Sequence, residues 1–464
     1  MRTPPTRRQV LAAGVLAVGS SGKLLPGTSG VLAPTAPIAW RPATLLGANI
    51  GGAFFYSPPT AGQKQYLWPA AVSFIRAFYS CYTTPSGWAP NTFSSGVRNV
   101  QTIQPYATDP TQFMLSCDQG TYAVQAGDPV VLSAPVSYQL ASGSAITLPA
   151  QTPLTCMGGT AGTFSSSNIQ TSPCTIRVAA GGTVPNNGAQ AVSGVMILHQ
   201  NFYTGGTTLR PEIASYTSLA NGWLAQGFAF DHGGYADNWG ALFSLFGISN
   251  VQPIREQEWA YFAGLGWNPA RVHISDENEM SLDMNWTWKN YATAWQTRFK
   301  AYFQGTLYPR MRYYFPAHTL GFGFPADCAP NATPYMDWWP ADPNTTLRLH
   351  VYMGPSATGF TGDNPADIAT YFNALNATIQ RIGVPRVHMQ EFNVDPSFWT
   401  SLSASEGALR IGNLRRAALE MGWLAAGWTL TPSGSLQPGL GNLGTLGSDG
   451  LFRPNLASGG FGLT

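Results

Sequence analysis

Eight short runs rich in apolar, β-branched and aromatic residues recur along the chain, and most are separated by segments in which apolar residues stand three and four positions apart. The runs cover residues 45–54, 72–79, 227–235, 271–280, 310–317, 346–353, 386–393 and 423–430. Strands that alternate with helices favour a parallel sheet. Eight is also the number of strands in a closed β/α barrel, so we expect an α/β protein built on a (β/α)8 TIM barrel.

Two of the intervening helices have recognisable ends. Apolar residues recur at helical spacing over residues 364–379, and the pattern stops at Gly383. Residues 405–421 follow the same pattern and stop at Gly422. Glycine is common directly after a helix because it adopts the left-handed backbone conformation without strain. A third helix is expected to begin near Pro211.

One interval is too long for an ordinary barrel connection, since about 130 residues separate Tyr79 from Pro211. Its composition shifts to Gly, Ser, Thr, Gln and Val, with short alternating apolar runs bounded by turn residues. We therefore expect a large antiparallel β domain, sandwich-like and covering residues 82–205, inserted after the second strand. The barrel then comprises 37–81 and 206–464. Because loops after barrel strands emerge at the catalytic face, the insertion is expected to border the cleft.

The first residues have the features of a targeting segment. Arg7 and Arg8 precede a short, mildly apolar stretch, which is typical of a twin-arginine export signal, and a linker rich in small residues and proline extends to residue 36. An ordinary secretory signal that contains two arginines is the alternative. Either signal predicts a periplasmic or extracellular protein. We expect no integral membrane association, because no other segment has the apolar length of a membrane span.

The composition fits a protein that acts on neutral polymers. Charged residues make up 10% of the chain and aromatic residues 12%, with a formal net charge of +2. Neither nucleic acid nor an anionic membrane is expected as a partner. No cysteine pair has zinc-ligand spacing, so no metal is expected. Cys156 and Cys174 could form a disulfide in an oxidising compartment, although buried free thiols are the alternative for the five cysteines Cys81, Cys117, Cys156, Cys174 and Cys328.

Two glutamates, Glu279 and Glu391, each follow an apolar run that is predicted to be a strand. Hydrolysis of a glycosidic bond requires two carboxyl groups, one to protonate the leaving oxygen and one to attack the sugar or activate water. Asp276 and Glu277 are rivals to Glu279, but only Glu279 follows an asparagine, Asn278, at the strand end. No phosphate-binding loop is present, so no cofactor is expected.

These residues belong to a longer series of motifs that follows the predicted strands in order. The series is Leu-Gly-Ala-Asn-Ile-Gly-Gly-Ala-Phe at 46–54, Phe-Ile-Arg-Ala-Phe at 74–78, Phe-Asp-His-Gly-Gly-Tyr at 230–235, Asn278-Glu279, His350-Val-Tyr352, Glu391-Phe392 and Trp428. It resembles glycoside hydrolase family 5, the cellulase family of clan A, over about two thirds of the chain and outside the insertion. The resemblance implies a TIM barrel that hydrolyses polysaccharides. Two positions depart from it, because Met280 replaces the usual proline and Gln390 the usual glycine.

The resemblance also implies a role for each motif residue. Glu279 is the expected acid/base and Glu391 the nucleophile, with Arg76 and Tyr352 stabilising the Glu391 charge. Asn278 is expected to contact the sugar 2-hydroxyl and Trp428 to form the floor of the site. His232 and His350 are candidates for sugar contacts and for orienting the carboxylates. Trp239, Trp338, Trp339 and Trp399 are further candidates for stacking on sugar rings, with burial in a core as the alternative.

We therefore expect a retaining endo-β-glycanase that acts on β-1,4-glucan or a related cell-wall polysaccharide or exopolysaccharide. Mannanase, β-1,3-glucanase and transglycosylase activities are alternatives within the same class. A catalytically silent polysaccharide-binding protein, or one associated with exopolysaccharide biosynthesis, is the alternative from another class. A third reading makes the insertion the principal binding module. The sequence does not indicate an oligomeric state.

Overall fold

The structure is a computed structural model, and it describes the following residues: 39–50, 72–79, 97–106, 109–117, 123–124, 129–139, 143–155, 162–163, 174–177, 188–199, 211–235, 243, 246–276, 300–325, 339–355, 359–395, 398, 401–431, 444–446 and 452–454. The predicted export signal and linker at 1–36 lie outside these ranges, as does Cys156. Export and the Cys156–Cys174 disulfide therefore stay predictions.

Eight parallel strands form a closed barrel. The first strand pairs with the last, with Leu46 aligned to Ala425, so the sheet has no open edge between them. Two short strands, β20 (Gly444–Leu446) and β21 (Phe452–Pro454), extend the sheet from the last barrel strand. This architecture confirms the predicted fold class. In order around the barrel, the strands are β1 (Leu46–Ile50), β2 (Val72–Tyr79), β14 (Ala229–Tyr235), β15 (Val272–Ser275), β16 (Thr319–Pro325), β17 (Thr345–Met353), β18 (Val387–Val394) and β19 (Leu424–Thr431).

The fifth predicted strand is wrong, whereas the other seven coincide with barrel strands. Residues 310–317 overlap the helix α9 (Tyr308–Tyr314), and the fifth strand is β16. Leu307, Met311 and Phe315 are buried at intervals of four residues, which is helical spacing. The many aromatic residues of this segment favoured a strand. Residues 319–325 were not predicted to be a strand, because the two glycines of β16 are unfavourable in strands.

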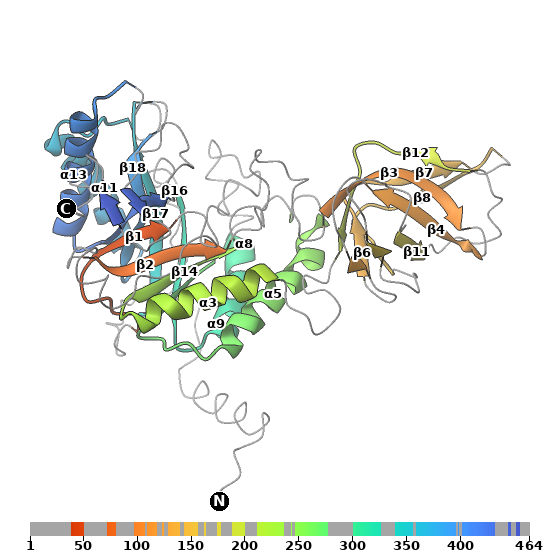
Figure 1. Ribbon diagram of the computed structural model, residues 1–464, viewed down its shortest axis with the longest axis horizontal. Helices are drawn as coiled ribbons and strands as arrows, with labels where there is room; N and C mark the ends of the chain where they lie inside the picture. The colour runs from red at the N-terminus through yellow and green to blue at the C-terminus, as the bar shows by residue number, and fades with distance from the viewer. Residues whose placement is uncertain are drawn as a thin grey trace, which may run out of the picture. The chain divides into compact units, whose positions relative to one another are not determined.

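Helices flank the barrel strands, as Figure 1 shows. Both helices predicted near the end of the chain are confirmed, and α13 begins with a capping box in which Ser403 and Glu406 bond each other's backbone N–H groups. Gly383 and Gly422 follow the last two helices with φ of 79° and 72°, a conformation that favours glycine. The helices are α3 (Pro211–Ala225), α5 (Ile248–Gly264), α8 (Lys300–Tyr302) with the π-helical turn η6 (Phe303–Leu307), α9, α11 (Pro365–Arg381) and α13 (Ala404–Glu420).

Residues of the barrel strands alternate between two environments. In β17, Leu347, Leu349 and Val351 belong to the hydrophobic core that the strands form with the helices. Arg348 and His350 alternate with them and are equally buried, so their side chains point into the barrel interior. Most barrels fill this interior with branched apolar residues. Here the apolar side chains lie outside the strands, and the interior is largely polar.

An apolar cluster closes the amino-terminal end of the barrel. It consists of Trp40, Phe74, Ala229, Leu424 and Ala426, all buried. The backbone N–H of Trp40 donates to the Thr319 hydroxyl at 3.0 Å, at the first residue of β16. Among the described residues, this cluster closes the amino-terminal end, so the polar interior faces the carboxyl ends of the strands.

The insertion after β2 consists of antiparallel strands, as predicted, although its sandwich-like form and its exact bounds stay predictions. One sheet has the order β11-β4-β3-β13-β6-β9 with β12 beside β3, and β10-β5 and β7-β8 form separate pairs. Its core includes Ile103, Phe113, Tyr138 and Ile197. The strands are β3 (Val97–Tyr106), β4 (Asp109–Cys117), β5 (Ala123–Val124), β6 (Pro129–Leu132), β7 (Val136–Gln139), β8 (Ala145–Leu148), β9 (Pro153–Thr155), β10 (Gly162–Thr163), β11 (Cys174–Arg177), β12 (Gln190–Ala191) and β13 (Met196–His199).

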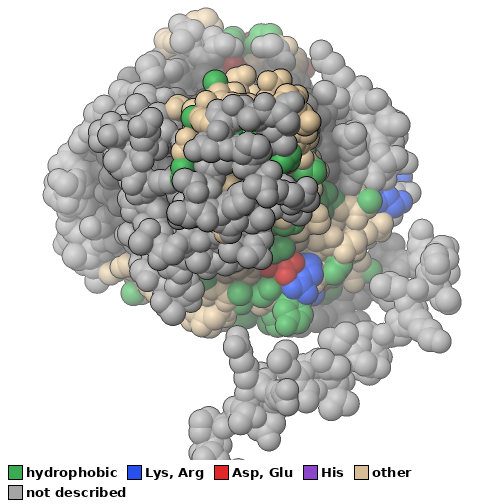
Figure 2. All heavy atoms as spheres, turned by 90° about the vertical axis from the view of Figure 1, so that its right-hand side faces the viewer, with side chains coloured by type: hydrophobic (Ala, Val, Ile, Leu, Met, Phe, Trp, Pro, Cys, Tyr) green, Lys and Arg blue, Asp and Glu red, His purple; other side chains and the backbone are tan. Residues whose placement is uncertain are grey.

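The described surface agrees with the composition in its small number of charged groups. Figure 2 shows one face of the molecule, on which the coloured side chains are mainly hydrophobic or uncharged and charged groups are few. Among the helices that the structure describes, none is both long enough and apolar enough to cross a membrane.

Helix α5 contains two glutamates whose surroundings predict opposite responses to pH. Glu258 is buried, which raises its pKa to about 8, and the nearby Arg255 only partly opposes this shift. The folded protein therefore retains a proton that the unfolded chain releases above about pH 4.5, so its stability falls as pH rises toward 8. Glu258→Gln removes this loss. Thermal unfolding should show the variant gaining stability over wild type, on the order of a few kcal/mol, at pH 8 and not at pH 4.5.

Glu256→Gln is the matched control on the same helix. Burial would raise the pKa of Glu256, but its hydrogen bond from Arg310 and those from Gln252 and Tyr314 lower it. The ionised Glu256 carboxylate therefore stabilises the fold above the ordinary glutamate pKa, and this stabilisation is lost as pH falls. Glu256→Gln should thus be less stable than wild type at neutral pH. Equal effects of the two substitutions at both pH values would contradict the assignment.

Candidate active site

Glu391 lies in β18 within the carboxyl-terminal half of the barrel and is 3% exposed. Its Oε1 is 2.5 Å from Nη1 of Arg76 on β2, and its Oε2 accepts a hydrogen bond of 2.7 Å from the Tyr352 hydroxyl on β17. Nδ1 of His350 is 3.5 Å from Oε2. Four of the residues predicted for the site, Arg76, His350, Tyr352 and Glu391, are thus brought together from three strands.

These contacts keep the Glu391 carboxylate ionised. Burial would raise its pKa, but the charges of His350 and Arg76, together with the hydrogen bonds from Tyr352 and Arg76, lower it below the ordinary value. A carboxylate that stays charged in a mostly water-free site, with both oxygens held by donors, is oriented for nucleophilic attack.

A β-bulge turns two consecutive side chains of β18 into the barrel. Leu349 pairs with Met389 and His350 pairs with Glu391, which leaves Gln390 as the extra residue between them. Asn49 on β1 holds the bulge, because its Nδ2 donates to the Gln390 carbonyl at 2.8 Å. Oδ1 of Asn49 accepts from Arg76 Nη1 at 2.7 Å, so the same side chain also positions the arginine.

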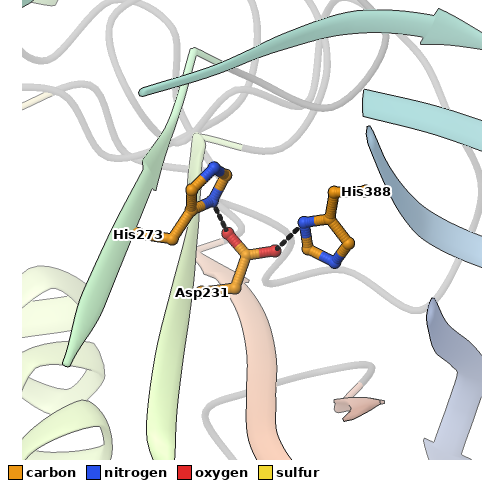
Figure 3. Close-up of side chains that lie close together, drawn as sticks. All are labelled: Asp231, His273 and His388. Carbon is orange, nitrogen blue, oxygen red and sulfur yellow. Dashed lines mark hydrogen bonds and ion pairs between the residues drawn. The ribbon is translucent and has the colours of Figure 1, made fainter. Parts of the chain in front are cut away.

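Beneath Glu391 lies a buried group of Asp231, His273 and His388 (Figure 3). Nδ1 of His273 is 2.6 Å from Oδ1 of Asp231, and its Nε2 is 2.8 Å from the Thr346 hydroxyl. Burial lowers the pKa of His273, so the neutral ring donates from Nδ1 to Asp231 and accepts from Thr346 at Nε2. Burial would raise the pKa of Asp231, yet the electrostatic interaction and hydrogen bond with His273, together with His388 and Arg76, lower it strongly.

The same three residues could in principle supply metal ligands, since their ligand atoms all lie within 4.8 Å of one another. The Asp231 oxygens, however, already accept bonds from His273, Ser275 and Gln390. Arg76 Nε is 3.9 Å from Oδ2, so a dication would lie beside a guanidinium. We assign the group to a hydrogen-bonded network. The prediction that the protein needs no metal stays a prediction.

Asp276, one of the rivals to Glu279, has a buried partner. It forms an ion pair with Arg348, while Arg255 of α5 donates to its backbone carbonyl. Two glycines of β16 make room for interior residues: a Cβ at Gly321 would collide with the His273 ring and lie 2.7 Å from the Arg348 side chain, and one at Gly323 would collide with the Arg348 carbonyl oxygen. This tight packing indicates that Asp276 belongs to the buried network that supports the site.

His232 does not join the group around Glu391. Its neighbour in β14, Asp231, points into the barrel, so the His232 side chain points outward, where its ring is 4.3 Å from that of Phe262 on α5. Tyr216 donates its hydroxyl to the Ala77 carbonyl at 3.0 Å, and His232 Nδ1 therefore donates to the Tyr216 oxygen at 2.7 Å. Burial lowers the pKa of His232 to about 3. This is a neutral core histidine, and its placement does not support a sugar contact.

The remaining predicted residues are placed only in part. Asn278 and Glu279 lie outside the described residues, just beyond the end of β15. Trp428 lies in β19, but its side chain is outside the description. Trp339 is buried, and its Nε1 donates to the Thr345 hydroxyl at 3.0 Å beside Phe322, so it is a core residue. The other stacking candidates, Trp239, Trp338 and Trp399, lie outside the described residues.

Sequence reasoning missed Asp231, His273 and the structural role of Gln390. The strand around His273 reads Val-His-Ile-Ser, in which polar and apolar residues alternate. In a strand that is buried on both faces, such alternation indicates a polar barrel interior. The bulge at Gln390 had no comparable signal, because it depends on pairing with β17.

Comparisons with known proteins find likeness in structure alone. The chain matches no family model and no curated protein. Among solved structures, it resembles ZgEngAGH5_4 in complex with a cellotriose, with 13% identity, a TM-score of 0.43 and coverage of 56% of this chain and 79% of that one. A GH5-4 broad-specificity endoglucanase from Clostridium cellulovorans has 17% identity, a TM-score of 0.41 and coverage of 56% and 80%. At these identities and TM-scores, the chemistry of the site rests on the contacts of Glu391.

Tyr352→Phe tests how the hydroxyl controls Glu391. The substitution removes one of the hydrogen bonds that lower the Glu391 pKa, so this pKa should rise and the acid limb of kcat/KM should move to higher pH. The control is Tyr308→Phe, which removes a hydrogen bond of 3.0 Å to Asp342 outside the site. It should leave the pH profile unchanged. An acid limb that stays in place in Tyr352→Phe would show that the hydroxyl does not act on the ionisation of Glu391.

Proposed function

We propose that the protein is a retaining glycoside hydrolase, an endo-β-glycanase that cleaves β-1,4-glucan or a related cell-wall polysaccharide or exopolysaccharide. The observation that carries the proposal is the state of Glu391. This carboxylate is buried near the carboxyl end of a barrel strand, its pKa is lowered, and Arg76 and Tyr352 hold its two oxygens. Active sites of TIM barrels lie at this end. Export by the predicted signal would bring the enzyme to such polymers.

The proposed reaction proceeds by double displacement. Glu391 attacks the anomeric carbon and forms a glycosyl ester, while Glu279 gives its proton to the glycosidic oxygen of the leaving sugar. In the second step, the Glu279 carboxylate takes a proton from water, and this water attacks the anomeric carbon and releases Glu391. Arg76 and Tyr352 orient the nucleophile and stabilise its charge when it leaves. The scheme uses no cofactor.

Retention of configuration is the first expected outcome. Glu279 follows β15 and Glu391 lies in β18, and in a retaining enzyme the two carboxyl groups stand about 5 Å apart. Nuclear magnetic resonance of the first products formed from a β-linked oligosaccharide should therefore show the β anomer. Initial release of the α anomer would indicate inversion and a wider separation of roughly 6.5–9.5 Å.

Substitution of the two glutamates separates their roles. Glu391→Gln should abolish hydrolysis of every glycan, because the amide is not a nucleophile. Glu279→Gln should abolish hydrolysis of polysaccharides but spare an aryl glycoside whose leaving group needs no protonation. Glu258→Gln, which makes the same change at a buried carboxyl outside the barrel, should retain activity on both substrates.

Other outcomes of this experiment would overturn parts of the proposal. Equal loss on both substrates in Glu279→Gln would contradict its role as acid. Hydrolysis by Glu391→Gln would remove this residue from the mechanism. If wild type binds polysaccharides in a broad screen but hydrolyses none, the protein is a binding module, and the proposed activity is wrong.

A further inference from the structure

The interior contacts continue from Asp231 to Glu391 through one side chain, that of Gln390. Nε2 of Gln390 donates to Asp231 Oδ2 at 2.9 Å and to the Ser275 hydroxyl at 2.8 Å. Its Oε1 accepts from Arg348 Nη1 at 2.6 Å and lies 3.3 Å from His350 Nε2. Gln390 therefore connects the buried Asp231–His273 pair with His350, which faces the nucleophile, and with Arg348.

The orientation of the Gln390 amide follows from the charge of Asp231. An ionised carboxylate can only accept hydrogen bonds, and the pKa of Asp231 is strongly lowered. The NH2 group of Gln390 must therefore face Asp231, and its carbonyl oxygen must face the other way. Because this oxygen only accepts, His350 Nε2 is the donor of their contact. His350 is thereby fixed with its Nδ1 toward Glu391 Oε2, at 3.5 Å.

His273 determines where Asp231 lies. The ring is held from both nitrogens, by Asp231 on one side and by Thr346 on the other, and it packs against Trp40 with the ring centroids 4.8 Å apart. Asp231 in turn has Arg76 Nε at 3.9 Å from Oδ2, so the carboxylate contributes to the position of the arginine as well.

We propose that Asp231 and Gln390 are positioning residues for the nucleophile: Asp231, held by His273, orients the Gln390 amide, and the Gln390 oxygen holds His350 in the orientation that faces Glu391. The role rests on the function proposed above. It also explains why this chain has glutamine before the nucleophile, since glycine could make none of these four contacts.

Gln390→Met tests the role, because methionine has a similar volume and cannot form these hydrogen bonds. We expect kcat to fall roughly tenfold to 100-fold with little change in KM, as for a small displacement of reacting groups. Gln252→Met is the matched control: it replaces a buried glutamine of α5 that accepts a hydrogen bond of 2.8 Å from Tyr302. It should lower thermal stability while kcat on folded protein stays unchanged.

Gln390→Glu tests the role through the pH dependence of kcat, which would not change if Gln390 were purely structural. The new carboxyl would face Asp231, and both burial and the like charge would raise its pKa. Its protonated form can donate to Asp231 as the amide does, so kcat should approach that of wild type at low pH and fall as the group ionises. The kcat profile should therefore show an ionisation that is absent from wild type and from Gln390→Met. A pH dependence that appears in thermal stability but not in kcat would show that Gln390 is merely structural.

A measurement without substrate separates this inference from the proposed function. The 15N resonance of His350 Nε2, identified with a His350→Gln variant among the six histidines of the chain, should shift in Gln390→Met because its acceptor is lost. If wild type hydrolyses glycans but neither kcat nor this resonance responds to Gln390→Met, the positioning role is overturned. If the resonance responds but wild type hydrolyses no glycan, the contacts stand and the proposed function is overturned.

Discussion

The buried ion pair between Arg76 and Glu391 is the interaction on which the candidate site depends. Both side chains are inside the barrel, and removal of one member of such a pair commonly costs about 3–5 kcal/mol because the other charge is left without compensation. Other interior side chains hydrogen-bond or pair with these two charged groups. Asn49 and Asp231 share the guanidinium, while Tyr352 holds the second carboxylate oxygen. The pair is therefore part of a network in which every charge has a partner.

Because the barrel interior is largely polar, the hydrophobic core lies elsewhere in the fold. It lies between the outer side of the strands and the helices, as at β17, and in the cluster around Trp40 that closes the amino-terminal end. Large interior side chains need space, and glycines on a neighbouring strand provide it: Gly321 and Gly323 lie against Arg348. A side chain at Gly321 would displace the His273 ring and the Arg348 side chain, and one at Gly323 would collide with the Arg348 backbone. Residues without any chemical function thus determine the geometry of the site.

The sequence predicted the barrel and most of its strands because each strand is a local pattern of apolar residues. It failed at residues 310–317, where the several aromatic residues of α9 resembled those of a strand. Arg76, Tyr352 and Glu391 were predictable since each belongs to a motif within one strand. His232 was misplaced because one position along a strand decides which face a side chain occupies. The sequence showed Gln390 only as a departure from the usual glycine of the motif. Its contacts depend on a bulge in the pairing of β17 with β18, which are distant in sequence from its partners on β14 and β15.

The sharing of Arg76 between two carboxylates has a chemical consequence. A nucleophilic carboxylate must be ionised, yet one that is fully neutralised by a single arginine is a weaker nucleophile. The Arg76 guanidinium interacts with both carboxylates. Its Nε is 3.9 Å from Asp231 Oδ2, and its Nη1 is 2.5 Å from Glu391 Oε1. Burial keeps the rings of His273 and His388 neutral, which leaves Asp231 as an anion and not a proton donor. Asp231 thus supplies a negative charge beneath the site, and in the proposed reaction Glu391 remains ionised without losing the negative charge that attack on an anomeric carbon requires.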